Sequence, residues 1–271
     1  MCKVLGVSRS SYYKYLIKKE SKRSIENKMF EERILDIYND SKKRYGAPKI
    51  HNILISRGYK ISLKRVQKLM KKLEIKSIII KKFKPYTSKN KVVGKENILK
   101  RDFTADSINQ KWVTDITYIY TLKDGWCYLA SVLDLYTKKI IGYSFSKAMD
   151  TDMAIKAVSN AINNQSPNNP IILHSDLGSQ YTSNKFKEFV DENKIIHSFS
   201  GKGNPYDNAC IESFHASLKK EEVNLVTYYD FNIARIAIFE YIEAWYNRKR
   251  VHSSIGYLTP QEFEDKLRQC G

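Results

Sequence analysis

Three acidic residues stand where carboxylates could act together on a phosphodiester. Asp176 closes the apolar run PIILHSD, Asp115 lies in the alternating segment WVTDIT, and Glu212 falls in the helical stretch DNACIESFHASLKKE. Taken singly, each acid is also explained as a structural or surface charge. Three converging carboxylates would repel one another unless cations were bound. Oxygen ligands suit Mg²⁺ or Mn²⁺, and two such ions can activate a hydroxyl and stabilise a leaving oxygen. Together, the acids predict a two-ion catalytic site.

The segments around these acids predict a mixed α/β domain. Three strands joined first by a tight Asp-Gly turn form an antiparallel meander, and helices then alternate with two further strands. This order matches a ribonuclease H-like fold, a mixed sheet flanked by helices on both faces. In that topology Asp115 and Asp176 lie on neighbouring strands and point to the same rim. The expected strands and helices are KWVTDITYIY, CYLASVLDLYT, KKIIGYSFSK, a helix over about 152–164, IILHSD, NKFKEFVDEN, IIHSFS and the helices that follow.

Positive charge is concentrated in the first part of the chain. The formal net charge is +18; residues 1–101 carry 29 basic and 8 acidic side chains, whereas residues 102–271 carry 18 and 21. A localised positive field is typical of a protein that binds a polyanion, most often nucleic acid. A lysine-rich protein without such a partner is the alternative. The asymmetry favours DNA as the partner.

The basic part is predicted to be all-helical. Residues 1–24 resemble the end of a helix-turn-helix, in which Val7, Tyr12 and Leu16 would pack together. Residues 25–76 predict a basic three-helix DNA-binding domain whose last helix is ISLKRVQKLMKKLEI. Ser62 would cap that helix. Residues 77–104 predict a basic linker along the phosphate backbone, and residues 105–271 the catalytic core with its C-terminal helices.

The last helix of this basic domain carries the predicted DNA contacts. Lys64, Arg65 and Lys68 lie off its apolar face, as suits a helix that reads a DNA groove. A solvated helix face without a partner is the alternative.

Several classes of protein are excluded by composition. The four cysteines are scattered, with no C-x-x-C pair, which argues against a zinc knuckle and a disulfide scaffold. No apolar run approaches the length of a membrane span, and the first residues do not form a secretory signal. We therefore expect a cytoplasmic, nucleoid-associated protein without a membrane partner.

The motifs WVTDIT, HSDLGSQYTS, GNPYDNACIESFHASLKKE and YNRKRVHSSIGYLTPQEF closely resemble the transposases of two-frame insertion sequences. They are similar to the second-frame product, which carries a DDE integrase-type core of the retroviral integrase superfamily. The resemblance covers 105–267 and, less closely, the basic unit with RYGAPKI. It implies that Asp115, Asp176 and Glu212 are the catalytic, metal-binding triad. It also implies DNA cleavage and strand transfer at element ends.

Other residues are expected to assist. The family has a basic residue at the position of Lys219, which implies DNA contact, although spacing alone is equally consistent with a solvated charge. His215 shares a helical face with Glu212, and His174 precedes Asp176 by two residues, so both could support the carboxylates. A core role for His174 is the alternative. Arg248 and Arg250 are expected to contact phosphate.

Three functions remain open at this level. A strand transferase accounts for both the acids and the basic region. A plain metal-dependent nuclease would not need so large a region for recognising DNA ends, and a DNA-binding regulator would not need all three acids. The incomplete first helix-turn-helix predicts a first-frame partner or a fusion to one, and we expect a homo-oligomer on DNA.

Overall fold

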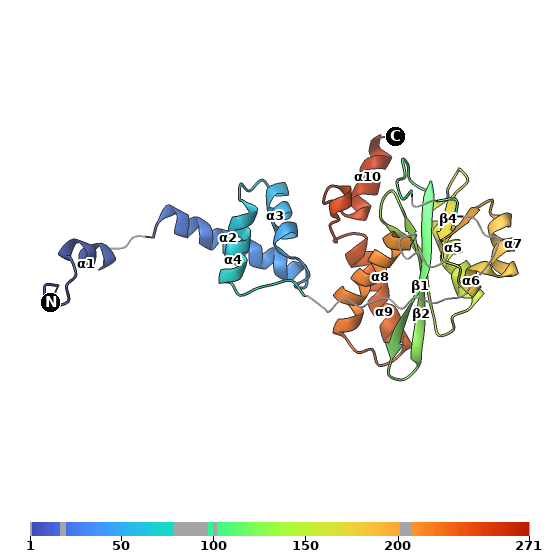
Figure 1. The fold of residues 1–271 in the computed structure, drawn as a ribbon, viewed down its shortest axis with the longest axis horizontal. Coiled ribbons are helices and arrows are strands. Elements are labelled where there is room, and N and C mark those ends of the chain that lie inside the picture. The colour runs from blue at the N-terminus through green and yellow to red at the C-terminus, as the bar shows by residue number, and fades with distance from the viewer. Residues whose placement is uncertain (1, 17–19, 79–96, 100–101, 201–207, 271) are drawn as a thin grey trace. The chain divides into compact units, whose positions relative to one another are not determined.

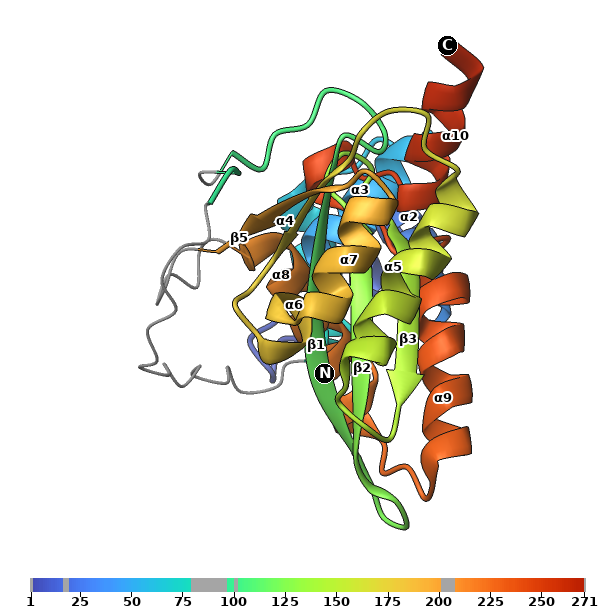
Figure 2. The same ribbon diagram turned by 90° about the vertical axis from the view of Figure 1, so that its right-hand side faces the viewer.

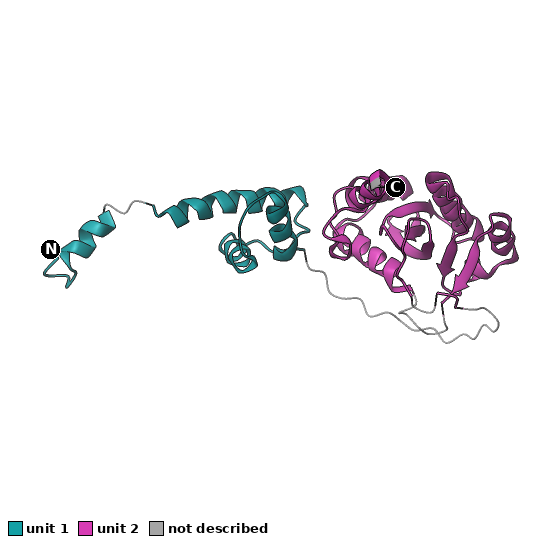
Figure 3. Cartoon of the chain, turned by 90° about the horizontal axis from the view of Figure 1, so that it is seen from above, with its two compact units in different colours: residues 1–78 teal, residues 79–271 magenta. Residues whose placement is uncertain are grey.

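The computed structural model describes residues 2–16, 20–78, 97–99, 102–200 and 208–270 (Figure 1). The chain divides into two compact units, residues 1–78 and 79–271, coloured separately in Figure 3. Within the described residues, no helix combines the length and the apolar character that crossing a bilayer would require.

The first unit is helical. Serine side chains cap two of its helices: Ser21 accepts from the backbone N–H of Ser24, and Ser62 accepts from that of Arg65. Apolar residues at helical spacing on three of the helices form its core, among them Ile34, Leu54 and Val66, which are fully buried. The helices are α1 (Arg9–Leu16), α2 (Lys22–Asp40), α3 (Ala47–Ser56) and α4 (Leu63–Lys72).

Helix α1 corrects one expectation. We expected Val7, Tyr12 and Leu16 to pack as part of a helix-turn-helix, but α1 contains no buried residue and all three side chains are exposed. The apolar spacing is present, but the packed partner that such a face requires is not found among the described residues.

The second unit is built on a five-stranded mixed sheet with strand order β3-β2-β1-β4-β5. The first three strands form the predicted antiparallel meander, and β4 and β5 run parallel to β1. The first hairpin turns at Asp124-Gly125, where Gly125 adopts a φ of +74°. The strands are β1 (Lys111–Thr121), β2 (Gly125–Asp134), β3 (Ile140–Ser146), β4 (Ile172–Ser175) and β5 (Ile196–Phe199).

Helices cover both faces of the sheet, as expected for a ribonuclease H-like fold. Helices α5 and α7 lie on one face, and α8 and α9 lie on the other (Figure 2). The contact of α5 with β3 is close: a Cβ added at Gly142 would lie 2.5 Å from the backbone of Ala157 and Ala161. The helices are α5 (Thr151–Gln165), α6 (Ser179–Thr182), α7 (Asn184–Glu192), α8 (Ala209–Glu221), α9 (Phe231–Glu240) and α10 (Pro260–Cys270).

The C-terminal helices depart from one prediction and confirm another. The long helix expected after α8 is α9 followed by a π-helical segment, Tyr241–Tyr246. Within this segment, Tyr241 and Trp245 both donate to one oxygen of Glu221. Helix α10 begins with the predicted capping box, in which Thr259 and Glu262 exchange hydrogen bonds.

The basic linker expected over 77–104 lies largely outside the described residues. Of its described part, Leu99 is buried, and the backbone N–H groups of Ile98 and Leu99 donate to Ser198 Oγ at 3.0 and 3.1 Å. The end of this segment is therefore held against β5.

Candidate catalytic site

Asp115 lies in the middle of β1, opposite Ser131 of β2. Its Oδ1 accepts from the backbone N–H of Ile116 at 2.8 Å, and its Oδ2 lies 3.4 Å from Nδ1 of His215. The other ring nitrogen of His215 forms a hydrogen bond of 3.1 Å with Ser131 Oγ. A buried histidine therefore lies behind Asp115 and is itself held by a serine on the next strand.

Strand register brings Asp176 beside Asp115. Val113 of β1 pairs with His174 of β4 in parallel register, and Asp115 and Asp176 each follow two residues later. Side chains two residues apart on a strand share a face, so both carboxylates emerge on the same side of neighbouring strands.

The surroundings of Asp176 disfavour its charge. Its Oδ1 accepts from the backbone N–H of Gly178 at 3.0 Å, which favours the ionised form. Burial first, and the charge of Asp115 second, outweigh this bond and raise the pKa of Asp176 to about 6. Such a carboxylate is suited to a bound cation, which would favour its ionised form.

Glu212 is presented by the first turn of α8. Ile211, Phe214 and Leu218 bury one side of this helix, which leaves Glu212 exposed and His215 facing Asp115. Burial, and after it the charge of Asp115, raise the pKa of Glu212, and His215 partly offsets them. The negative charge of Asp115 therefore raises the pKa of both other acids of the predicted triad.

The acids do not form a closed metal cage. In the described residues, no three His, Cys, Asp or Glu side chains are grouped closely enough to hold a metal ion. Magnesium is usually held by one or two carboxylates together with substrate phosphate, rather than by an all-protein cage. An all-oxygen set of acids, two of them with raised pKa values, fits a divalent ion that binds together with a phosphate.

Lys219 lies on the same side of α8 as Glu212 and His215, two turns further on. Its ammonium is 4.0 Å from the ring centroid of Tyr118. Burial lowers the pKa of Lys219, although Asp115 acts in the opposite direction. The structure thus brings a positive charge within electrostatic reach of Asp115.

The two histidines differ. His215 contacts Asp115, as expected of a supporting residue. His174 instead forms a hydrogen bond of 2.9 Å with Ser198, the residue that also receives the linker backbone. Ser198 therefore connects His174 to the end of the linker through hydrogen bonds. This agrees with the alternative that His174 is a core residue and does not support the carboxylates.

Two residues near the acids were not assigned a role in the site from the sequence, where Tyr181 was expected only to pack. Ser131 holds His215, and the only signal in the sequence was its place in a buried strand. Tyr181 is fully buried, with its hydroxyl 3.0 Å from Thr114 Oγ1. Burial, and then the charge of Asp115, raise the pKa of this tyrosine. Neither partner could be identified without knowing which strands and helices meet.

The predicted DNA contacts divide into exposed and internal residues. Lys64, Lys68 and Arg248 are exposed. Arg65 instead pairs with Glu26 at 2.7 Å.

Arg250 likewise has internal partners. It pairs with Glu221 at 3.1 Å and donates to Ser217. Its side chain is 14% exposed. Burial lowers the pKa of the guanidinium, but Glu221 together with Tyr241 and Tyr246 outweighs burial, so the pKa is raised. Both guanidinium groups are therefore engaged within the chain, and the phosphate contacts of Arg65 and Arg250 stay a prediction.

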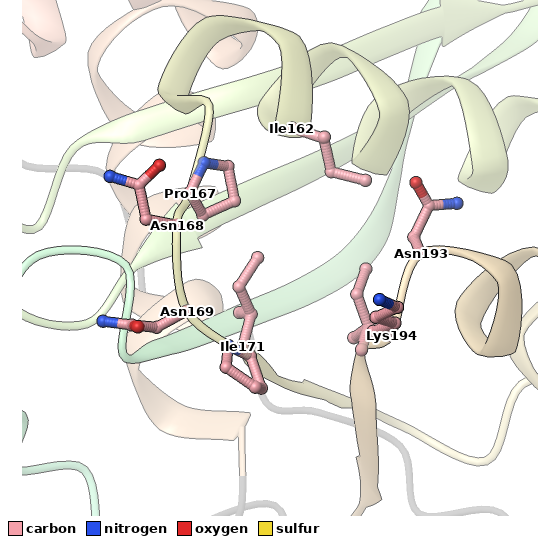
Figure 4. A pocket seen from close by; sticks show the side chains of 9 residues that line it. Ile162, Pro167, Asn168, Asn169, Ile171, Asn193 and Lys194 are labelled. Atoms are coloured by element: carbon pink, nitrogen blue, oxygen red, sulfur yellow. The ribbon is translucent and has the colours of Figure 1, made fainter.

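The second unit also holds a pocket of about 200 Å³, whose lining side chains are drawn in Figure 4. It is lined by the segments that precede β4 and β5, including Pro167, Asn169, Ile171 and Lys194. Asp176 follows the opposite end of β4. The pocket therefore does not belong to the candidate catalytic site.

Comparison with solved structures finds integrase cores. The HTLV-2 integrase catalytic core domain in complex with magnesium is 20% identical and covers 57% of this chain and 95% of its own, with a TM-score of 0.43. The catalytic core domain of BIV integrase is 16% identical and covers 60% and 99%, also with a TM-score of 0.43.

Sequence comparison finds family models and full-length relatives. An HTH-like domain model matches residues 24–83, and two integrase core domain models match residues 105–205 and 193–260. The transposase InsF for insertion sequence IS3A of Escherichia coli K12 is 36% identical over 98% of this chain and 93% of its own length. The transposase for insertion sequence element IS904 of Lactococcus lactis is 36% identical over 91% and 98%. The chain therefore belongs to the family of insertion-sequence transposases that carry an integrase core domain.

Proposed function

We propose that this DNA transposase cleaves and joins DNA at the ends of an insertion sequence through Asp115, Asp176 and Glu212, with bound Mg²⁺ or Mn²⁺. The observation that supports this most is the position of Asp115: it lies beside Asp176 by strand register, and its charge raises the pKa of both other acids. Carboxylates that destabilise one another in this way are suited to binding cations.

The reaction needs no nucleophile from the protein. In the first step, a water oxygen bonds to phosphorus at the element end, and the bond from phosphorus to the 3′ oxygen breaks, which frees a 3′-hydroxyl. In the second, that hydroxyl attacks a phosphodiester of target DNA and displaces the 3′ oxygen of the neighbouring nucleotide. Two divalent ions, when bound, would activate the attacking oxygen and stabilise the leaving one.

The side chains around the acids have separate tasks in this proposal. His215, held by Ser131, fixes the orientation of Asp115. Lys219 offsets charge on the DNA phosphate beside the acids. Lys64, Lys68 and Arg248 are exposed and contact the DNA backbone.

A Mg²⁺-dependent assay on a labelled duplex of the element's own end tests the function. We expect the wild type to nick the end and join its 3′ strand to a second duplex. Glu212→Gln, Asp115→Asn and Asp176→Asn should each lower both steps at least about a hundredfold and still bind the duplex. Normal cleavage by any of these variants would contradict the assignment of that acid.

The same assay separates the alternatives. Nicking without joining would indicate a nuclease. Binding without either step would indicate a DNA-binding protein, or a transposase that needs its first-frame partner. We further propose that the transposase acts with a first-frame partner. Adding that partner, or fusing it to the chain, should then restore both nicking and joining. We also propose that the active form is a homo-oligomer assembled on DNA.

A further inference from the structure

Three aromatic side chains are exposed together beside the candidate catalytic site. Tyr118 and Tyr120 of β1 and Trp126 of β2 are 45%, 50% and 52% exposed. The ring of Trp126 meets each tyrosine edge to face, at centroid distances of 5.1 and 5.2 Å. Large aromatic residues gathered in this way on a protein surface usually mark a binding site.

The edge of the strand that carries the two tyrosines is unpaired over part of its length. In the described part of the chain, the ladder between β1 and β4 ends at Val113, before Asp115, and the next pairing on this edge is the bridge between Thr121 and Tyr228. Tyr118 lies three residues beyond Asp115, about 10 Å along the strand. A DNA strand bound at the acids and running along this edge would therefore pass the aromatic cluster within one or two nucleotides.

Lys219 joins the cluster to the acids. Its ammonium lies over the ring of Tyr118 and also interacts electrostatically with the carboxylate of Asp115. Asp115 and Tyr118 are an odd number of residues apart and face opposite sides of the strand, and Lys219 interacts with both. A positive charge beside exposed rings fits a nucleic acid better than an apolar protein surface.

We infer that Tyr118, Tyr120 and Trp126 form a stacking platform for an unpaired DNA base next to the reacting phosphodiester. A base inside a duplex has both faces covered by its neighbours, so it can stack on a side chain only after leaving the helix. The inference rests on the proposed function, since it assumes that DNA reacts at the three acids. It adds that the DNA is locally unpaired there.

Binding without divalent metal tests the platform apart from cleavage. Two duplexes of the element's end would be compared, one fully paired and one with a single unpaired base beside the cut. We expect the wild type to bind the second more tightly. Trp126→Ala and Tyr120→Ala should each lower affinity for the unpaired duplex about tenfold, and leave that for the paired duplex unchanged.

Matched controls separate stacking from other uses of this surface. Trp126→Phe keeps a ring and should retain most of the preference. Leu122→Ala removes an exposed apolar side chain from the same hairpin, 59% exposed, and should retain all of it. As a direct readout, 5-iodouracil at the unpaired position should photocrosslink to the segment 118–126.

Three results would overturn the inference. First, the wild type and Trp126→Ala could prefer the duplex with the unpaired base to the same extent. Leu122→Ala could lose as much affinity as Trp126→Ala, which would indicate an apolar docking surface. Trp126→Ala could alter the oligomeric state in sedimentation without altering the preference, which would indicate contact with a second copy. Wild-type cleavage of the paired duplex in Mg²⁺, measured in parallel, shows whether the proposed function itself holds.

Discussion

At the scale of single residues, Asp176 is the acid most displaced from its ordinary behaviour. In the unfolded chain its pKa is near 3.8, and in the folded protein burial and Asp115 raise it to about 6. Between these values the folded protein retains a proton that the unfolded chain has lost. The contribution of Asp176 to the free energy of unfolding therefore falls as pH rises from about 4 to about 6. Above pH 6 the carboxylate is ionised in the folded protein, and the full energetic cost of its buried charge is present.

Replacing this acid should stabilise the metal-free protein. Asp176→Asn keeps an oxygen that can accept from Gly178 and removes the buried charge. We expect its free energy of unfolding at pH 7.5 to rise by up to about 3 kcal/mol, and the difference from the wild type to vanish near pH 4. Urea denaturation in EDTA at the two pH values measures this.

The control for Asp176 is the same substitution at an exposed acid. Asp191→Asn on α7 should change stability by less than about 0.5 kcal/mol at either pH. Adding Mg²⁺ should stabilise the wild type and Asp191→Asn more than Asp176→Asn, since metal binding requires the ionised carboxylate. Equal stability of wild type and Asp176→Asn at pH 7.5 would show that the raised pKa is wrong.

At the scale of elements, α8 serves both the site and the fold. Its first turns present Glu212 and His215, whereas its last residue, Glu221, accepts hydrogen bonds from Tyr241 and Trp245 of the π-helical segment. Glu221 also pairs with Arg250. The C-terminal segment therefore fixes the end of the helix that carries the third acid.

Two neighbouring arginines should consequently behave differently. Arg250→Ala leaves Glu221 largely buried without its cation, and we expect a loss of about 3 kcal/mol in stability. Arg248→Ala removes an exposed charge, and should alter stability by less than about 0.5 kcal/mol while weakening DNA binding. Thermal denaturation and duplex binding of both variants, side by side, measure this contrast. If Arg250→Ala were as stable as the wild type, the Glu221 network would not be structural.

At the scale of the whole molecule, charge is divided between the units. The strongly basic first part holds the exposed lysines of α4, and the second unit holds the acids. Contacts to phosphate release counterions, so each one adds to the salt dependence of binding. Affinity and chemistry are thus expected to reside largely in different units.

Salt dependence tests this division. In the full chain, the double variant Lys64→Ala, Lys68→Ala should reduce the slope of log affinity against log salt by about 2, for all DNA sequences alike. Lys156→Ala with Lys187→Ala, exposed lysines of α5 and α7, removes the same charge from the second unit and serves as control. Equal slopes for the two double variants would argue against α4 as the DNA-binding helix.

Local patterns were predictable because their physics is local. The first strand, the Asp-Gly turn, the Ser62 cap and the Thr259–Glu262 capping box each depend on residues close in sequence, and the structure confirms all four. The strand order could also be predicted, since connections between elements restrict the topology. The places of Asp115 and Asp176 on neighbouring strands followed from that order. The joint role of the three acids was implied by the family resemblance and stays a proposal.

The sequence by itself thus determined the ribonuclease H-like core, the basic helical part and the family. Only the tertiary structure decided which charged side chains have a partner within the chain. Arg65 meets Glu26 across 39 residues of sequence, and Arg250 meets Glu221 across 29. It also decided that Ser131 holds His215. The reason is physical: a buried polar group must find a partner, and that partner is chosen by the packing of distant elements, which residue spacing does not encode.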